Sequence, residues 1–194
     1  MSMSEAVDFK IVEEPKRPLA MHPKKFGLWL FMASVFILFM AFTSAYIVRR
    51  AEGNWQIFEL PALFTYSTIV ILLSSVTMQW TYFAVKRNQL ANAKNMIVLT
   101  SVAGVIFLAL QWMGWGSLIE SSIHLVGNPS GSFLYIITGL HAAHIISAIV
   151  FLLVVLANAL RNRFNLNQIE MCTTYWHFLG VLWLYLFVFL TLLR

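Results

Sequence analysis

Five long apolar runs without a single Asp, Glu, Lys or Arg constrain the fold of this chain more than any other feature. They cover approximately residues 26–48, 61–85, 95–119, 132–160 and 172–193. A helix rises about 1.5 Å per residue, so roughly 20 residues cross a hydrocarbon core of ~30 Å. Only 11% of the residues are charged, against about 25% in soluble domains. The sequence therefore predicts an all-α, polytopic membrane protein with five transmembrane helices.

A polar segment precedes the first run. Residues 1–25 contain Pro15, Pro18 and Pro23, which discourage a long helix. We therefore expect two parts: a polar tail at 1–25 and a transmembrane domain at 26–194. His22, near the end of the tail, is expected to be a solvated residue at the membrane surface.

The lysines and arginines are distributed unequally between the two ends of the predicted helices. The tail, the second connection and the fourth connection share one side and hold 5, 3 and 2 of them, whereas the other side holds Arg49, Arg50 and Arg194. Basic residues accumulate on the cytoplasmic side of membranes, so this bias predicts a cytoplasmic N-terminus and an exterior C-terminus. The net charge of +5 then reflects contact with anionic lipid headgroups, and no nucleic acid partner is expected.

Small and polar residues recur at helical spacing on one face of several runs. Helices associate in lipid through small residues and polar contacts, so these faces are expected to meet neighbouring helices. The face residues are Gly27, Ser34, Ala41 and Ala45 in the first run, Thr68, Ser75, Gln79 and Tyr82 in the second, Thr100, Gly104, Gln111 and Trp115 in the third, and Thr173, His177 and Gly180 in the fifth.

Three histidines lie within the runs, where ionisable groups are rare and often functional. His141 and His144 share one helix face and cannot clamp a haem from opposite sides, which leaves only His177 as a second ligand. No carboxylate lies inside a run, and the single thiol, Cys172, stands alone. We therefore expect no metal site and no catalytic residue in this chain. Neutral histidines that hydrogen-bond across helices are expected instead, with Thr138, Gln111, Tyr135 or backbone carbonyls as partners. Contact with lipid headgroups or a partner subunit remains the alternative.

Two motifs carry a family resemblance. The segment Tyr175-Trp176-His177-Phe178-Leu179-Gly180 lies in the last run, and Tyr135-Ile136-Ile137-Thr138-Gly139-Leu140-His141-Ala142-Ala143-His144 lies one run earlier. Together they resemble subunit III of haem-copper terminal oxidases, the cytochrome c and quinol oxidases, in the five-helix bacterial form. Residues 22–34 also resemble the family's entry into its first shared helix, and residues 107–112 resemble the start of its Gln-x-x-Glu segment, so the resemblance covers essentially all five spans.

The resemblance implies a non-catalytic subunit without cofactors of its own. Such a subunit packs mainly on the catalytic subunit I, whereas haem and copper reside in partner subunits. It holds phospholipid in a cleft between two helices and the other three, and it lies in the bacterial inner membrane with a periplasmic C-terminus. Whether the oxidase joins a respiratory supercomplex is left open. The candidates for a lipid-contacting or packing network are His141, His144, His177, Trp176, Gln111, Thr138 and Tyr175.

Three positions depart from the family pattern. Val35, Gly114 and Gly180 stand where the family usually carries a carboxylate. This departure predicts that the subunit supports turnover as a scaffold and passes no protons through its interior. Two other functions fit parts of the sequence: an accessory subunit of nitric oxide reductase, and a small independent transporter.

Overall fold

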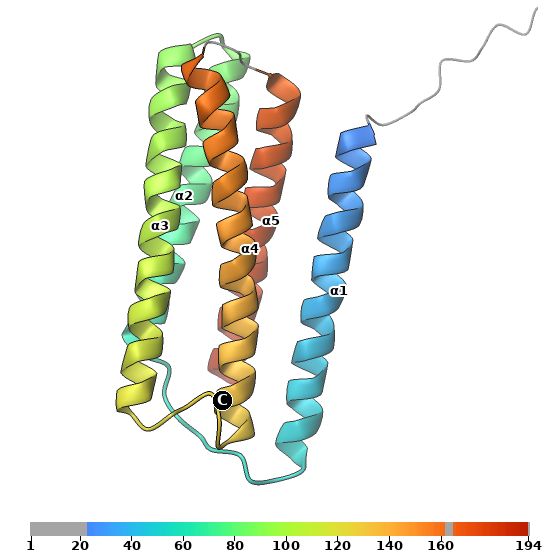
Figure 1. The fold of residues 1–194 in the computed structure, drawn as a ribbon, viewed down its shortest axis with the longest axis vertical. Helices are drawn as coiled ribbons and strands as arrows, with labels where there is room; N and C mark the ends of the chain where they lie inside the picture. Colours follow the sequence, from blue (N-terminus) through green and yellow to red (C-terminus); the bar gives the residue numbers. More distant parts are fainter. Residues whose placement is uncertain (1–22, 162–164, 194) are drawn as a thin grey trace, which may run out of the picture.

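The computed structural model describes residues 23–161 and 165–193, and this part of the chain contains five long α-helices and no strand (Figure 1). The helices are α1 (Pro23–Ala51), α2 (Ala62–Lys86), α3 (Leu90–Glu120), α4 (Pro129–Leu160) and α5 (Leu166–Leu192). Each is long and apolar enough to cross a membrane. The prediction of an all-α polytopic membrane protein is confirmed. His22 and most of the polar tail lie outside the described residues.

Several helices extend beyond the apolar runs that predicted them. α3 begins at Leu90 rather than near residue 95, and α5 begins at Leu166 rather than near 172. As a result, Glu120 and Glu170 lie in the ends of helices, not in connections. The length of an apolar run corresponds to the thickness of the hydrocarbon core. The helix itself continues into the polar interface until a cap or turn ends it.

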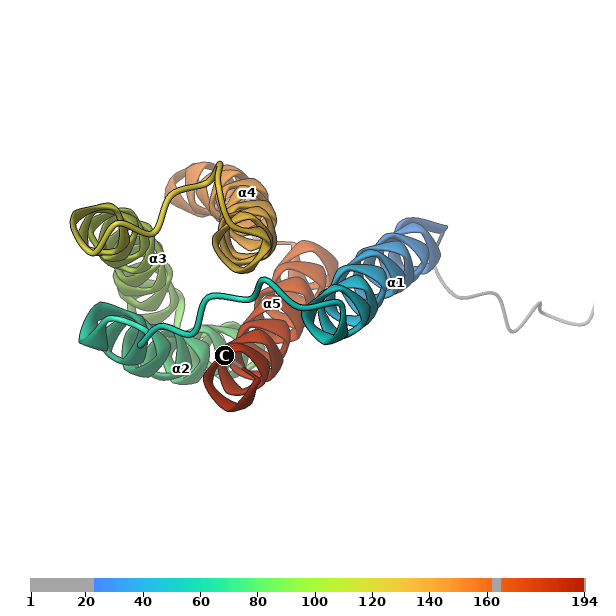
Figure 2. The ribbon, with the colours of Figure 1, turned by 90° about the horizontal axis from the view of Figure 1, so that it is seen from below.

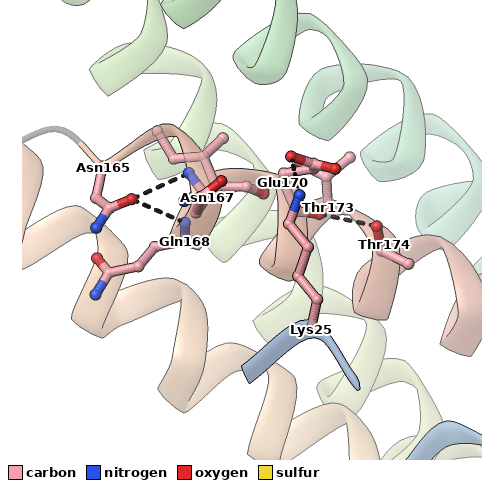
Figure 3. A network of polar contacts seen from close by, with 8 residues as sticks. Lys25, Asn165, Asn167, Gln168, Glu170, Thr173 and Thr174 are labelled. Carbon is pink, nitrogen blue, oxygen red and sulfur yellow. Dashed lines mark hydrogen bonds and ion pairs between the residues drawn. The ribbon is translucent and has the colours of Figure 1, made fainter. Parts of the chain in front are cut away.

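Asparagine side chains cap the last two helices. Asn165 Oδ1 accepts the backbone N–H groups of Asn167 and Gln168 at 3.0 and 3.4 Å (Figure 3). Asn128 Oδ1 accepts the N–H of Ser130 at 3.0 Å. These bonds satisfy N–H groups that the first turn of a helix leaves without an intrahelical partner.

The helices are grouped as four plus one. α2, α3, α4 and α5 form a bundle, and α1 lies outside it against α4 and α5 (Figure 2). Within the described residues α1 makes no contact with α2, so the expected two-plus-three arrangement is not confirmed. The physical reason is the direction of the small-residue faces. Gly27, Ser34, Ala41 and Ala45 of α1 are all exposed, whereas the hydroxyl face of α2 is buried against α3 and α5.

Polar contacts hold both ends of α1. Near its N-terminus, Lys25 Nζ donates to Glu170 of α5 at 2.8 Å in a partly exposed ion pair (Figure 3). Near its C-terminus, the Tyr46 hydroxyl donates to the carbonyl of Leu193 at 3.0 Å. Exposed ion pairs contribute only about 0–1 kcal/mol to the free energy of folding. The Lys25–Glu170 pair therefore helps to position α1 but adds little to the stability of the protein.

The connection from α1 to α2 crosses the end of the bundle below α4 and α5 (Figure 2). The side chain of Asn128 fastens it: Oδ1 accepts the N–H of Gln56 at 3.3 Å and Nδ2 donates to the carbonyl of Asn54 at 3.1 Å. Trp55 packs edge-on against Tyr46 with ring centroids 4.6 Å apart. One asparagine therefore joins the start of α4 to a distant connection.

Three helices meet at Gly104 of α3. A Cβ added there would lie 2.8 Å from the Trp176 ring of α5 and 3.1 Å from Ile149 of α4. Gly116, also on α3, has no such neighbour within 4 Å. The absence of a side chain at position 104 thus allows the close approach of α4 and α5 to α3.

We predict that Gly104→Val destabilises the bundle by about 1–3 kcal/mol, because the added atoms overpack a filled interior. Gly116→Ala is the matched control on the same helix. It should leave stability unchanged or raise it, since Ala is a better helix former by up to about 1 kcal/mol. Thermal unfolding of the detergent-solubilised protein measures both. Equal midpoints for Gly104→Val and the parent would show that the helices do not meet at this residue.

Candidate functional site

Two buried tryptophans of α5 hydrogen-bond to hydroxyl groups of α2. Trp183 Nε1 donates to Thr68 Oγ1 at 2.9 Å, and Trp176 Nε1 donates to Ser74 Oγ at 3.0 Å. Thr68 in turn donates its own hydrogen to the carbonyl of Phe64 at 2.7 Å. Both indoles are at most 1% exposed, so lipid and water do not reach them. These bonds fix the contact between α2 and α5.

The same arrangement joins α3 to both of its neighbours. Trp115 Nε1 donates to Thr138 Oγ1 of α4 at 3.1 Å, and Thr138 donates to the carbonyl of Leu134 at 2.7 Å. On its other side, Gln111 Nε2 donates to Ser67 Oγ of α2 at 2.8 Å. Each hydroxyl thus gives its hydrogen to its own helix and offers a lone pair to the next one.

His141 lies in an aromatic cage at the centre of the molecule. Its ring centroid is 5.0 Å from Trp183 of α5, 6.0 Å from Phe107 of α3 and 6.3 Å from Phe39 of α1. The side chain is 0% exposed, and no protein group in the described residues bonds either ring nitrogen. The expected bonds from this histidine to Thr138, Gln111 or Tyr135 are therefore absent from the described part of the chain.

His144 faces α1 from the next turn of α4. Its Nδ1 is 2.7 Å from the carbonyl of Leu140 on its own helix, so the bond does not cross to another helix as expected. Its ring lies 5.7 Å from Phe39 and 6.3 Å from Phe31 by centroids. Tyr175 completes this contact, with its ring 5.7 Å from Phe31. Together the rings of His144 and Tyr175 form a surface on which α1 packs.

The Tyr175 hydroxyl links α5 to α4. It lies 2.8 Å from Ser147 Oγ, which donates to the carbonyl of His144 at 2.7 Å. The predicted packing candidates His144 and Tyr175 are thus in one cluster. Trp176, Gln111 and Thr138 belong to the separate hydroxyl network of the bundle interior.

His177 lies on the outer side of α5 and bonds to another helix, with a partner that was not among those expected. Its Nε2 is 3.0 Å from Oε1 of Gln79 on α2. It lines two hollows, one of about 380 Å³ with Gln79 and Trp80 of α2 and one of about 440 Å³ with Trp29 and Phe36 of α1. The histidine therefore sits where α5 is uncovered between α1 and α2.

Two central residues were not among the predicted candidates. Trp183 and Phe39 are fully buried and both contact His141. Trp183 stands seven residues after Trp176, the spacing of one helix face, and this spacing could have indicated it. Phe39 is one of several similar aromatic residues in its run, and the sequence gives no signal that distinguishes it.

The three positions without the family's carboxylate are all in close contact with other helices or buried. Val35 is 3% exposed. A Cβ on Gly114 would lie 2.8 Å from the ring of Phe64, and one on Gly180 would lie 3.2 Å from Ser75 Oγ. Among the described residues no three His, Cys, Asp or Glu side chains come together as a metal site, and Cys172 is buried and unpaired with another cysteine.

Comparison with known proteins gives one consistent match. A family model described as cytochrome c oxidase subunit III matches residues 16–193. Cytochrome c oxidase subunit 3 of Corynebacterium diphtheriae is 28% identical and aligns with 96% of this chain and 97% of its own length. The subunits 3 of Heterololigo bleekeri and Latimeria chalumnae are each 29% identical over 84% of this chain and 67% of their own. Because the family match includes all five helices, the chain belongs to the cytochrome c oxidase subunit III family.

Proposed function

We propose that this chain is the non-catalytic subunit III of a bacterial respiratory haem-copper oxidase. The observation that carries the proposal is the family match over residues 16–193. A bacterial relative that aligns over nearly the full length of both chains supports it. In this role the chain binds no cofactor, packs on the catalytic subunit I, and supports oxygen reduction and proton pumping as a scaffold. Haem and copper belong to the partner subunits.

Purification of the chain from its native membrane tests this function. We expect it to copurify with a larger subunit and with haem and copper, in a complex that consumes oxygen. Variants His141→Leu, His144→Leu and His177→Leu should keep the visible haem spectrum per assembled complex, because no histidine of this chain holds a haem. Copurification of haem with non-haem iron would indicate a nitric oxide reductase instead. Purification without any partner would indicate an independent protein such as a transporter.

We also propose that the N-terminus is cytoplasmic and the C-terminus periplasmic, in the inner membrane. The basic count supports this orientation, since Arg49 and Arg50 are the only arginine or lysine residues of the described part on the proposed periplasmic side. At the proposed cytoplasmic side lie Lys25, Arg87 and Arg161, at the ends of α1, α2 and α4.

A reporter that fluoresces only in the cytoplasm checks the orientation. We expect a fusion after residue 194 to stay dark. A fusion after Arg161, in the connection between α4 and α5, is the matched control and should fluoresce. The reverse pair of results would contradict the proposed orientation.

We propose further that the chain holds phospholipid in a groove between α1 and α2. α5 forms the floor, where Val181 is 69% exposed and His177 is half-buried. α1 and α2 do not touch, so their facing sides leave the hollows described above. The apolar lining suits acyl chains. This groove differs from the expected cleft, because α1 alone forms one wall and the bundle forms the other.

Filling the groove tests lipid retention. Val181→Trp places a large side chain on its floor, so we expect the delipidated complex to retain less tightly bound phospholipid, measured by mass spectrometry. Val150→Trp is the control, since Val150 is 55% exposed on α4, away from this groove. Equal phospholipid in both variants and the parent would exclude the groove as the binding site.

A further inference from the structure

Two buried polar side chains, Gln111 of α3 and His141 of α4, have atoms that no protein group in the described residues satisfies. His141 is 0% exposed and lacks a partner at both ring nitrogens. Gln111 is 1% exposed and lacks a partner at Oε1. Nearly all buried polar atoms in native proteins bond to protein or to ordered water, because an unpaired one loses the hydration it had in the unfolded chain. Lipid offers no substitute.

The orientation of the Gln111 amide follows from its neighbour. Ser67 Oγ donates its only hydrogen to the carbonyl of Phe64 at 2.8 Å. It can therefore only accept from Gln111, which requires the amide nitrogen at the 2.8 Å contact. The atom left without a partner is then the amide oxygen, which is an acceptor.

The neighbouring contacts place the two groups at one level. Phe107, one turn before Gln111 on α3, lies 6.0 Å from His141 by ring centroids. Trp115, one turn after Gln111, donates to Thr138 at 3.1 Å. Thr138 is one turn before His141 on α4. Gln111 thus lies between two contacts that bracket the segment 138–141 of the opposite helix.

We propose that an ordered water molecule lies between His141 and Gln111 and joins α4 to α3. The imidazole N–H is a donor and the amide oxygen is an acceptor, yet neither has a hydrogen-bond partner in the described residues, so they do not bond directly. A group between them must accept from the imidazole and donate to the amide. Water does both. Thr138 Oγ1 accepts from Trp115 and keeps a second lone pair for the other water hydrogen. Buried waters typically make about three hydrogen bonds, which this site supplies.

The water also has a role for α1. It holds the His141 ring in one orientation, and Phe39 of α1 packs on that ring with an interplanar angle of 71°. The site therefore links the contact between α3 and α4 to the packing of α1 on His141. This inference goes beyond the proposed function and holds whichever complex contains the chain.

A density map of the full-length protein in its native complex, at a resolution that shows ordered water, tests the site directly. We expect one peak within hydrogen-bonding distance of both a His141 ring nitrogen and Gln111 Oε1. The contrary result is a continuous protein contact with no peak. In that case the ring N–H points at the face of Phe107 or Phe39, whose planes lie at 77° and 71° to the imidazole.

A double-mutant cycle gives a second test. His141→Leu and Gln111→Leu should each lower the unfolding midpoint of the complex, since each leaves one polar end of the bridge unpaired. The double variant should be no less stable than the worse single one, because both ends are then apolar. The control cycle pairs His141→Leu with Gln79→Leu, which bonds His177 instead, and should be additive. Additivity in the His141–Gln111 cycle would overturn the proposal.

Discussion

The hydrocarbon core of a membrane accepts and donates no hydrogen bonds, so polar side chains inside the five spans depend on partners in the protein or on buried water. Ser and Thr side chains of α2 and α4 meet this requirement through the same hydrogen-bonding arrangement at several positions. Thr68, Ser74 and Thr138 each donate to a carbonyl three or four residues back on their own helix. Each then presents only a lone pair to its neighbour, which suits indole N–H groups that can only donate. The pairing is directional, so it determines which faces of α2, α3, α4 and α5 meet.

α1 is attached by a different kind of contact. It has no indole–hydroxyl bond to the bundle among the described residues. Its polar contacts lie toward its two ends, and the rings of Phe31 and Phe39 contact α4 between them. The Tyr185 hydroxyl donates to Thr43 Oγ1 at 3.0 Å, and Phe39 lies between the rings of His141 and His144. Aromatic pairs of this kind contribute about 0.5–1.5 kcal/mol beyond burial. α1 is thus held at one depth and one rotation while its flanks stay open, which is the condition for the proposed lipid groove.

The sequence predicted the spans because hydrocarbon thickness sets the length of an apolar run, whatever the neighbours are. It did not predict the helix ends, which depend on caps such as Asn165 in polar chain. It also did not predict that α1 packs outside the other four helices, because a face of small residues indicates close packing but does not identify the partner helix. The expected hydrogen-bond partners of the histidines are not the ones found, for a similar reason. Thr138 and Gln111 were expected as hydrogen-bond partners of the histidines, but in the structure Thr138 accepts from Trp115 and Gln111 donates to Ser67. The rotation of each helix about its own axis decides which side chains meet, and the residue pattern within one helix does not determine that rotation.

The substituted acid positions show what this interior can contribute. A carboxylate at position 114 would displace Phe64, which stacks on Trp183 with an interplanar angle of 16°. Trp183 in turn supplies the bond to Thr68 and one wall of the His141 cage. Close aromatic packing thus occupies the space that an ionisable group and its hydration would need. All eight acidic residues lie outside the apolar runs. An interior built from hydroxyls, amides and aromatic rings resists deformation but offers no carboxylate to carry a proton, and this is the physical basis of the proposed scaffold role.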